Sequence, residues 1–304
     1  MSDNSDRRGF LKCMAWAGSA MVWSVAGGVP RSRLIGSAEA ATQEFSFVQV
    51  SDSHLGFNKP VNTDPTATLQ AALAQVKALP GQPAFMLHTG DITHLSQPAA
   101  FDTAQQMMRQ TGLAVHTVPG EHDILEEDGK SYLHRFGKGS KGDGWYSFDA
   151  GGVHFIGLIN VVDLQGNGLG ALGHEQLEWL EHDVAGLSAS TPVVVFAHVP
   201  LWVVYEPWGW GTADGAQALR YLRRFGSVTV LNGHIHQVMQ KVEGHVAFHT
   251  ARSTAFPQPA PGQAKSPGPM AVPPGALRSY LGVARVSLVS AASPLAIVDS
   301  PLMG

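Results

Sequence analysis

Short apolar runs alternate with amphipathic segments through the first half of the chain. Runs rich in apolar and β-branched residues predict buried strands, and apolar residues at helical spacing predict helices. The predicted strands are residues 44–50, 84–89 and 114–118, and the predicted helices between them are residues 65–79 and 97–110. This order of strand, helix, strand, helix, strand predicts parallel strands joined by crossover helices.

The second half of the chain continues the alternation and then becomes all-β. Ala150-Gly151-Gly152 splits two strand-like runs, which predicts a hairpin. The strands predicted here are residues 145–149, 153–158, 192–197, 228–231, 237–242, 246–250, 281–289 and 295–298, with helices at 174–187 and 216–224. Because helices accompany strands in both halves, the pattern predicts an α/β fold of two sheets packed face to face with helices outside.

One long stretch interrupts the pattern. Residues 256–275 contain seven prolines and almost no periodicity, which predicts either a long ordered loop or a flexible lid. No stretch after residue 40 is polar enough to indicate a linker between domains. We therefore expect a single domain over residues 41–304.

The first forty residues have the layout of a signal peptide. Arg7 and Arg8 precede an apolar stretch of small residues, and residues 37–41 contain an A-x-A cleavage pattern. The segment Arg-Arg-Gly-Phe-Leu-Lys resembles the twin-arginine (Tat) export signal, which implies the Tat export machinery as a partner and a periplasmic or exported location. The alternative is a short uncleaved anchor helix. No apolar run beyond residue 45 is long enough for a membrane span, so we expect none in the mature protein.

Composition and charge exclude several classes of protein. Hydrophobic residues make up 44% of the chain and charged residues 14%, which excludes a disordered protein. The formal charge of −4 argues against a stable nucleic-acid complex that relies on a basic surface. Cys13 is the only cysteine, so an internal disulfide and any cysteine-based zinc cluster are excluded. With 14 histidines in the chain, a metal would have to be held by histidine and carboxylate.

Aspartates and histidines follow five of the predicted strands. Ligands bind beyond the carboxyl ends of strands in α/β sheets, so these side chains are expected at one edge. In chain order they are Asp52 and His54, then Asp91, then Glu121, His122 and Asp123, then His198, and finally His234 and His236. Such a set suits zinc, manganese or iron. Glycines before Asp91, Glu121 and His234 permit tight turns where the backbone approaches a ligand.

This ordered set resembles the motifs of the calcineurin-like metallophosphoesterase superfamily, which are Asp-x-His, Gly-Asp, Gly-Asn-His-Asp, His and Gly-His-x-His. The resemblance runs from about residue 45 to 237. It implies a four-layer α/β/β/α sandwich with a dinuclear centre of divalent or mixed-valence manganese, iron or zinc. It also implies a small-molecule phosphoester substrate, attacked by a hydroxide that bridges the two metals. The motifs are closest to those of the cyclic-nucleotide phosphodiesterases.

Carried over by position, the resemblance assigns a role to each residue of the set. One metal is expected at Asp52, His54 and His236, and the second at residue 121, His198 and His234, with Asp91 bridging both. His122 is expected near the leaving group, and Asp123 is expected to orient it.

Two positions need separate consideration. The family has asparagine where this chain has Glu121, and a carboxylate there adds negative charge beside the second metal. Glu121 is expected to ligate that metal, and the alternative is that it swings away.

Purple acid phosphatases carry an iron-binding tyrosine where this chain has His94, so the chain does not resemble that branch. His94 is expected to be an extra ligand, a hydrogen-bond partner of a ligand, or a plain surface residue.

The segment after His198 is the candidate substrate pocket. It carries four aromatic residues that could form an apolar wall: Trp202, Tyr205, Trp208 and Trp210. The alternative is that this loop only anchors itself on the sheet. Arg252 is a candidate phosphate clamp. A metal-binding scaffold without turnover is the rival function, and it predicts lost ligands or a lost catalytic histidine.

Overall fold

The computed structural model describes residues 20–26, 29–35, 45–126, 129–289 and 295–303. The chain divides into two units between Glu44 and Phe45. In the first unit, β1 (Ala20–Ala26) pairs antiparallel with β2 (Val29–Ile35). The paired arginines and the A-x-A pattern that predict a signal peptide lie outside the described residues. Among the described residues, no helix has the length and apolar character needed to cross a membrane.

The second unit is built on two sheets. The six-stranded sheet has the order β10 (Gln240–Glu243), β11 (Val246–Thr250), β9 (Val228–Asn232), β8 (Val193–Phe196), β7 (Val153–Gly157) and β6 (Tyr146–Ala150). The five-stranded sheet has the order β13 (Ala296–Pro301), β12 (Gly282–Ser287), β3 (Ser46–Val50), β4 (Phe85–His88) and β5 (Ala114–Thr117). Strands β3, β4 and β5 are parallel, as are β7, β8, β9 and β11, which confirms the predicted crossover pairing.

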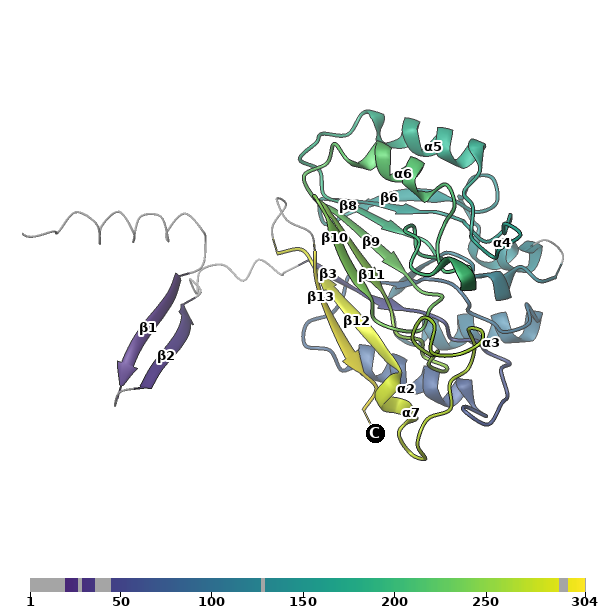
Figure 1. Ribbon diagram of the computed structural model, residues 1–304, viewed down its shortest axis with the longest axis horizontal. Coiled ribbons are helices and arrows are strands. Elements are labelled where there is room, and N and C mark those ends of the chain that lie inside the picture. Colours follow the sequence, from purple (N-terminus) through teal and green to yellow (C-terminus); the bar gives the residue numbers. More distant parts are fainter. Residues whose placement is uncertain (1–19, 27–28, 36–44, 127–128, 290–294, 304) are drawn as a thin grey trace, which may run out of the picture. The chain divides into compact units, whose positions relative to one another are not determined.

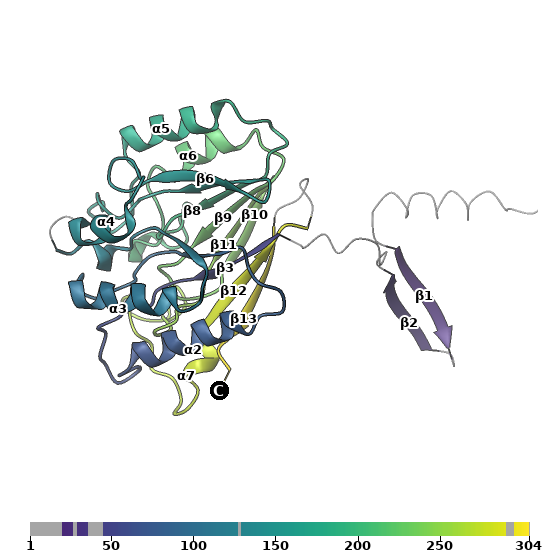
Figure 2. The same ribbon diagram turned by 180° about the vertical axis from the view of Figure 1, so that it is seen from behind.

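Helices cover the outer face of each sheet (Figures 1 and 2). The helices α5 (His174–Ala185) and α6 (Gly215–Leu222) pack on the six-stranded sheet. The helices α2 (Pro65–Lys77), α3 (Pro98–Arg109), α4 (Lys130–Phe136) and α7 (Leu277–Tyr280) pack on the five-stranded sheet. The result is the predicted four-layer α/β/β/α sandwich.

Alternating side chains explain the four layers. In β3, Phe47 faces the other sheet, whereas Val48 and Val50 face the helices. Phenylalanines from both sheets fill the space between them: the Phe47 ring stacks on Phe85 at 5.1 Å and meets Phe155 edge-on at 5.2 Å. Burying each of these rings contributes about 2–3 kcal/mol, so this middle layer holds the two sheets against each other.

Most predicted elements are present, and the differences lie in short or exposed segments. The helices α4 and α7 were not predicted, nor were the 3₁₀ turns Glu121–Asp123 and Glu206–Trp208. The strand predicted from residue 237 begins at Gln240. The Gln237 side chain instead donates hydrogen bonds to the carbonyl oxygens of Gln258 and Pro259, and this holds the preceding turn against the proline-rich loop.

A buried histidine links the six-stranded sheet to its covering helix. His154 on β7 places Nδ1 2.8 Å from Asp149 Oδ1 on β6 and Nε2 2.9 Å from Asp183 Oδ2 on α5. Burial lowers the pKa of His154, but the hydrogen bonds and charges of Asp183 and Asp149 outweigh it, so the pKa lies above its usual value. The histidine is therefore charged in the folded state at a pH where it is neutral in the unfolded chain.

We predict a pH-dependent loss of stability from this pair of contacts. Their stabilisation is complete below the unfolded pKa of about 6.5 and falls as the pH rises through the raised folded pKa. His154→Gln should lower the free energy of unfolding by about 2 kcal/mol at pH 5.5 and by less at pH 9, measured by urea unfolding. The exposed His174→Gln is the control. A wild-type-minus-variant difference that stays constant across this pH range would contradict the prediction.

Candidate metal centre

The loops that follow β3 and β4 run side by side and carry the first candidate ligands. Asp52 N donates to Gly90 O at 3.0 Å, and His54 N donates to Asp91 O at 2.9 Å. One step further, Leu55 N donates to Ile92 O at 3.0 Å. Backbone pairing therefore continues past the ends of the two strands and fixes the ligand-bearing turns relative to each other.

The backbone at most candidate ligands has an unusual conformation. Six non-glycine residues of the described chain have left-handed φ angles: Asp52, His54, Asp91, Ser96, His234 and His236. Five of these six are predicted metal ligands. This conformation costs a non-glycine residue about 1–2 kcal/mol and persists only where the surroundings impose it. Strain is thus concentrated at the centre, a feature that residue patterns alone did not reveal.

The first ligand cluster contains Asp52, His54 and His236. Asp52 Oδ1 lies 3.2 Å from His236 Nε2, and His236 Nε2 lies 3.2 Å from His54 Nε2. All three side chains are buried, and each directs one ligand atom to a common point. The structure thus brings together the three residues expected at the first metal.

The second cluster contains Glu121, His198 and His234. Glu121 Oε2 lies 2.9 Å from His198 Nε2, and Glu121 Oε1 lies 3.0 Å from His234 Nδ1. Glu121 Oε2, His198 Nε2 and His234 Nδ1 are buried without hydrogen-bond partners among the described residues. The three atoms face one another at ion-pair distance without a hydrogen bond, and a cation shared by all three would satisfy them. Glu121 points into the cluster rather than swinging away.

Asp91 lies between the two clusters. Its Oδ2 is 3.4 Å from His54 Nε2 of the first cluster and 3.5 Å from His198 Nε2 of the second. Its Oδ1 accepts a hydrogen bond from His122 N at 3.0 Å. One carboxylate oxygen therefore faces both clusters, which is the arrangement required of a bridging ligand.

Backbone carbonyls orient the imidazoles. His198 Nδ1 donates to Thr89 O at 2.7 Å, and His236 Nδ1 donates to Phe256 O at 2.6 Å. Because a carbonyl oxygen can only accept, these contacts place the proton on Nδ1 and leave Nε2 free. Histidine ligands of metals are commonly held in this way.

The carboxylates of the centre are held in the ionised form. Burial raises the pKa of Glu121, but His234 and His198 outweigh it and hold the pKa well below its usual range. Burial likewise raises the pKa of Asp52, and His236 and His198 reverse the effect. Burial lowers the pKa of His54 well below its usual value, which keeps this imidazole neutral. His198 is the exception: burial lowers its pKa, but Asp91 and Glu121 outweigh this and raise the pKa well above its usual value. A metal requires ionised carboxylates and neutral imidazoles, so a cation at the second cluster would replace the proton of His198.

Glycines make room for the centre, as predicted. A Cβ atom on Gly120 would collide with the Asp91 carboxylate, and one on Gly90 would collide with the His198 ring. Gly90 also has a φ of 94°, in the left-handed region that glycine adopts readily. Both positions therefore combine a tight turn with close approach to a ligand.

The expected role of Asp123 is wrong. Its carboxylate is buried and accepts hydrogen bonds from the backbone N–H groups of Ile92, Thr93 and Gly120. It therefore fixes the turn that carries the ligands and does not contact the His122 ring. His122 Nδ1 instead donates to His94 O at 2.7 Å, which fixes the tautomer that was expected to depend on Asp123.

His94 lies behind the first cluster. Its Nδ1 is 3.3 Å from His54 Nδ1, and its ring stacks on the His122 ring at 4.6 Å. Burial is the main cause that lowers the pKa of His94 to about 4, so this ring is neutral. Two of the alternatives left open by the sequence fit: His94 contacts the expected ligand His54, and His54, His94 and His122 also form a group that could hold a metal ion.

A pocket of about 360 Å³ opens above the two clusters. Trp208 and Trp210 line it, as expected from the sequence, but Trp202, Tyr205 and Arg252 do not. Trp202 packs on Phe248 at 5.0 Å, where it anchors the loop on the sheet. Tyr205 lies behind Trp208, at 5.2 Å between ring centres.

Arg252 also lies elsewhere. Its guanidinium donates to the carbonyl oxygens of Ser279 and Tyr280, so the expected phosphate clamp is wrong. Lys59 is instead the only lysine or arginine among the described residues that line the pocket, so it is the residue that could contact a phosphate there. Lys59 lies five residues after His54, on the loop that follows the first motif. This closeness to a predicted ligand is the sequence feature that could have identified Lys59 as a pocket residue.

The proline-rich loop is ordered and forms one wall of the pocket. Phe256 stacks on Phe57 at 4.3 Å, with His236 at 4.6 Å from its ring centre. Gln258 Nε2 donates to His234 O at 2.9 Å, and Pro267 and Pro269 line the pocket. Of the two expectations for this segment, these contacts match the ordered loop.

Comparison with known proteins identifies the family. The family model for calcineurin-like phosphoesterases matches residues 45–238. The chain is 24% identical over 199 residues to a probable cyclic nucleotide phosphodiesterase of Psychrobacter sp. (strain PRwf-1), over 62% of this chain and 57% of that protein. It is 25% identical over 229 residues to one of Synechococcus sp. (strain ATCC 27144), over 70% of this chain and 83% of that protein.

A solved structure shares the fold. It is a dimetal phosphatase from Danio rerio, with a TM-score of 0.61 and 18% identity, and the similarity covers 84% of this chain and 98% of that one. At this level of identity the similarity extends to the fold alone. The match of the family model over most of the chain, together with the two ligand clusters, supports one conclusion: the chain belongs to the calcineurin-like phosphoesterases, hydrolases that act on phosphoric esters.

Proposed function

We propose that this protein is a phosphodiesterase that acts on small phosphodiesters, with cyclic nucleotides as the substrate class. The observation that carries the proposal is the pair of ligand clusters joined by Asp91 at the floor of a pocket with an aromatic wall. The names of the relatives from Psychrobacter and Synechococcus support the same class. The pocket volume of about 360 Å³ suits a small molecule.

The donor set suits two divalent or mixed-valence ions of manganese, iron or zinc. When bound, such ions polarise phosphoryl oxygens and lower the pKa of an attacking water. We assign Asp52, His54 and His236 to one ion and Glu121, His198 and His234 to the other, with Asp91 shared.

Glu121 makes the ligand set more negative than the asparagine of the family would. Asp52, Asp91 and Glu121 together contribute three negative charges to the ligand set. The extra carboxylate repels a monoester with two negative charges more than a diester with one, which supports a diester substrate.

His122 is the proposed proton donor to the leaving oxygen. Burial lowers its pKa, but the carboxylates of Asp91 and Glu121 and the hydrogen bond to the His94 carbonyl raise it above the usual value. With Nδ1 bonded to the backbone, Nε2 is the atom that can deliver a proton. We propose His94 as a positioning residue, because it contacts both the His54 and His122 rings.

The pocket walls are proposed to position the substrate. Trp208 offers an apolar ring on which a nucleobase can pack, and Lys59 offers a positive charge within the same pocket. The rival function, a metal-binding scaffold without turnover, predicts lost ligands or a lost catalytic histidine. Both ligand clusters retain metal-binding side chains and His122 is present, which supports the enzyme over the scaffold.

We further propose that the protein is exported through the Tat machinery to the periplasm. The proposal rests on the Arg-Arg-Gly-Phe-Leu-Lys segment and the A-x-A pattern of the first 41 residues. Export after folding would allow the metal centre to be filled before translocation.

We predict that Asp91→Asn lowers phosphodiesterase activity most, by at least about 100-fold, because one substitution removes the bridge between both clusters. Asparagine tolerates the left-handed backbone at this position, so the fold should be retained. The assay is hydrolysis of bis-p-nitrophenyl phosphate with added Mn²⁺, and chelation should abolish it. The exposed Asp143→Asn is the control. Full activity of metal-stripped Asp91→Asn protein would overturn the assignment of the centre.

We predict that the Glu121 variants separate metal affinity from turnover. Glu121→Asn and Glu121→Gln remove one negative charge, so a higher metal concentration should be needed for saturation, while turnover at saturation rises by up to about 100-fold. Glu121→Ala should lose the second metal and most activity. Metal content and metal titration of activity are the measurements. Equal metal dependence in all four proteins would show that Glu121 is not a ligand.

We predict that replacing Arg7 and Arg8 by lysine traps the precursor in the cytoplasm, because the paired arginines are the recognised feature of the signal. Cell fractionation and N-terminal sequencing measure the outcome, with a mature terminus near Ala41 in the wild type. Replacing Arg31 and Arg33 by lysine is the matched control and should leave export intact. Native periplasmic protein that still begins at Met1 or Ser2 would rule out the cleaved signal.

A further inference from the structure

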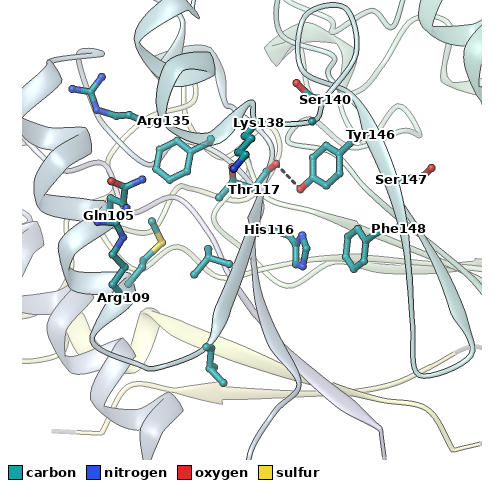
Figure 3. Close-up of a pocket in the computed structure, with 15 residues that line it drawn as sticks. Gln105, Arg109, His116, Thr117, Arg135, Lys138, Ser140, Tyr146, Ser147 and Phe148 are labelled. Atoms are coloured by element: carbon teal, nitrogen blue, oxygen red, sulfur yellow. Dashed lines mark hydrogen bonds between the residues drawn. The ribbon is translucent and has the colours of Figure 1, made fainter.

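A second cavity, of about 520 Å³, lies away from the metal centre (Figure 3). None of the residues that line it also lines the metal pocket. It is bounded by the edge strands of both sheets, β5 of the five-stranded sheet and β6 of the six-stranded sheet, together with α3 and the chain that follows α4. The cavity thus occupies the open side of the sandwich, where each sheet lacks a further strand.

The strands supply a rigid aromatic wall. The His116 ring on β5 stacks on the Phe148 ring on β6 at 3.9 Å and 11°, and Tyr146 lies nearly parallel to Phe148 at 17°. Tyr146 Oη donates to Thr117 O at 2.9 Å, which ties the two edge strands together at the cavity floor (Figure 3). Burial lowers the pKa of His116, so the ring is uncharged. Phe155 stacks on Phe148 at 4.9 Å and 8°, so Phe148 is enclosed between His116 and Phe155. The wall is therefore preformed, and the rings left to contact a planar ligand are His116 and Tyr146.

The opposite wall is polar and positively charged. Arg109 at the end of α3, Arg135 on α4 and Lys138 after α4 line it, and no aspartate or glutamate is among the described residues that line the cavity. Arg135 is engaged by Asp102 at 2.8 Å. The side chains of Arg109 and Lys138 have no hydrogen-bond or ion-pair partner among the described residues. Both side chains are exposed to solvent, so they can turn towards an anion in the cavity without breaking an existing contact.

We propose that this cavity is a second ligand site, which binds a small aromatic anion of the nucleoside monophosphate class. The base would pack against His116 and Tyr146, and the phosphate would pair with Arg109 and Lys138. The cavity volume lies within the range of small-molecule sites. The site does not depend on which ester the metal centre hydrolyses.

The test is calorimetric titration of AMP into full-length Asp91→Asn protein, in which turnover is suppressed. One equivalent of AMP should bind in this cavity, in addition to any AMP bound at the metal pocket. Arg109→Gln with Lys138→Gln in the same background should weaken the binding of that equivalent alone by about tenfold or more. Arg220→Gln is the matched control, because Arg220 is also an exposed arginine in the last turn of a helix, α6. Thermal unfolding of each variant checks that the fold is retained.

Two further measurements test the chemistry and the place of binding. Inorganic phosphate and adenosine should each bind about tenfold or more weakly than AMP, because each lacks one half of the ligand. In wild-type protein, AMP should slow amide hydrogen exchange in β5 and β6, and this effect should be lost in the double variant. Absence of AMP binding, equal binding to the double variant, or phosphate binding as tight as that of AMP would each overturn the proposal.

Discussion

The packing of one sheet against the other is the interaction on which the metal centre depends. The carboxylates and His54 come from loops of the five-stranded sheet, whereas His198, His234 and His236 come from loops of the six-stranded sheet. Neither sheet carries a complete ligand cluster by itself. The phenylalanines between the sheets therefore do more than stabilise the fold, because they set the distance at which carboxylates from one side meet imidazoles from the other.

Because the ligands come from loops of two different sheets, the hydrogen bonds that hold those loops and orient the ligand rings matter as much as the ligands themselves. Asp123 holds three backbone N–H groups, and carbonyls of Thr89, Phe256 and His94 each hold one imidazole. Apart from the local contact between Gly120 and Asp123, these contacts join residues 20 or more positions apart in the sequence. Preorganised in this way, the ligands do not have to be reoriented when cations bind, which reduces the cost of assembling two positive ions in a small volume.

Periodic patterns predicted the buried strands, the crossover helices and the gathering of aspartates and histidines at one sheet edge. The division of those residues into two ligand clusters, and the four-layer sandwich, came from the resemblance of the ordered motifs to a known family. Side-chain direction in loops does not follow such a pattern, and this explains the errors. Arg252 and Trp202 were close to the centre in sequence, but one caps carbonyls of a short helix and the other packs on Phe248. The contact between Asp123 and the turn after β4 joins segments 30 residues apart, so no local motif could reveal it.

The left-handed backbone at five ligands also restricts how this centre can change during evolution. Aspartate, asparagine and histidine adopt this conformation more readily than other non-glycine residues, so positions 52, 54, 91, 234 and 236 admit a narrow choice of side chains. Residue 121 begins a 3₁₀ turn and is free of that restriction, as is His198. Substitution of a ligand, and with it a change of metal preference, is therefore least restricted at residues 121 and 198 of the second cluster. Position 121 is also where this chain carries a glutamate instead of the asparagine of the family motif.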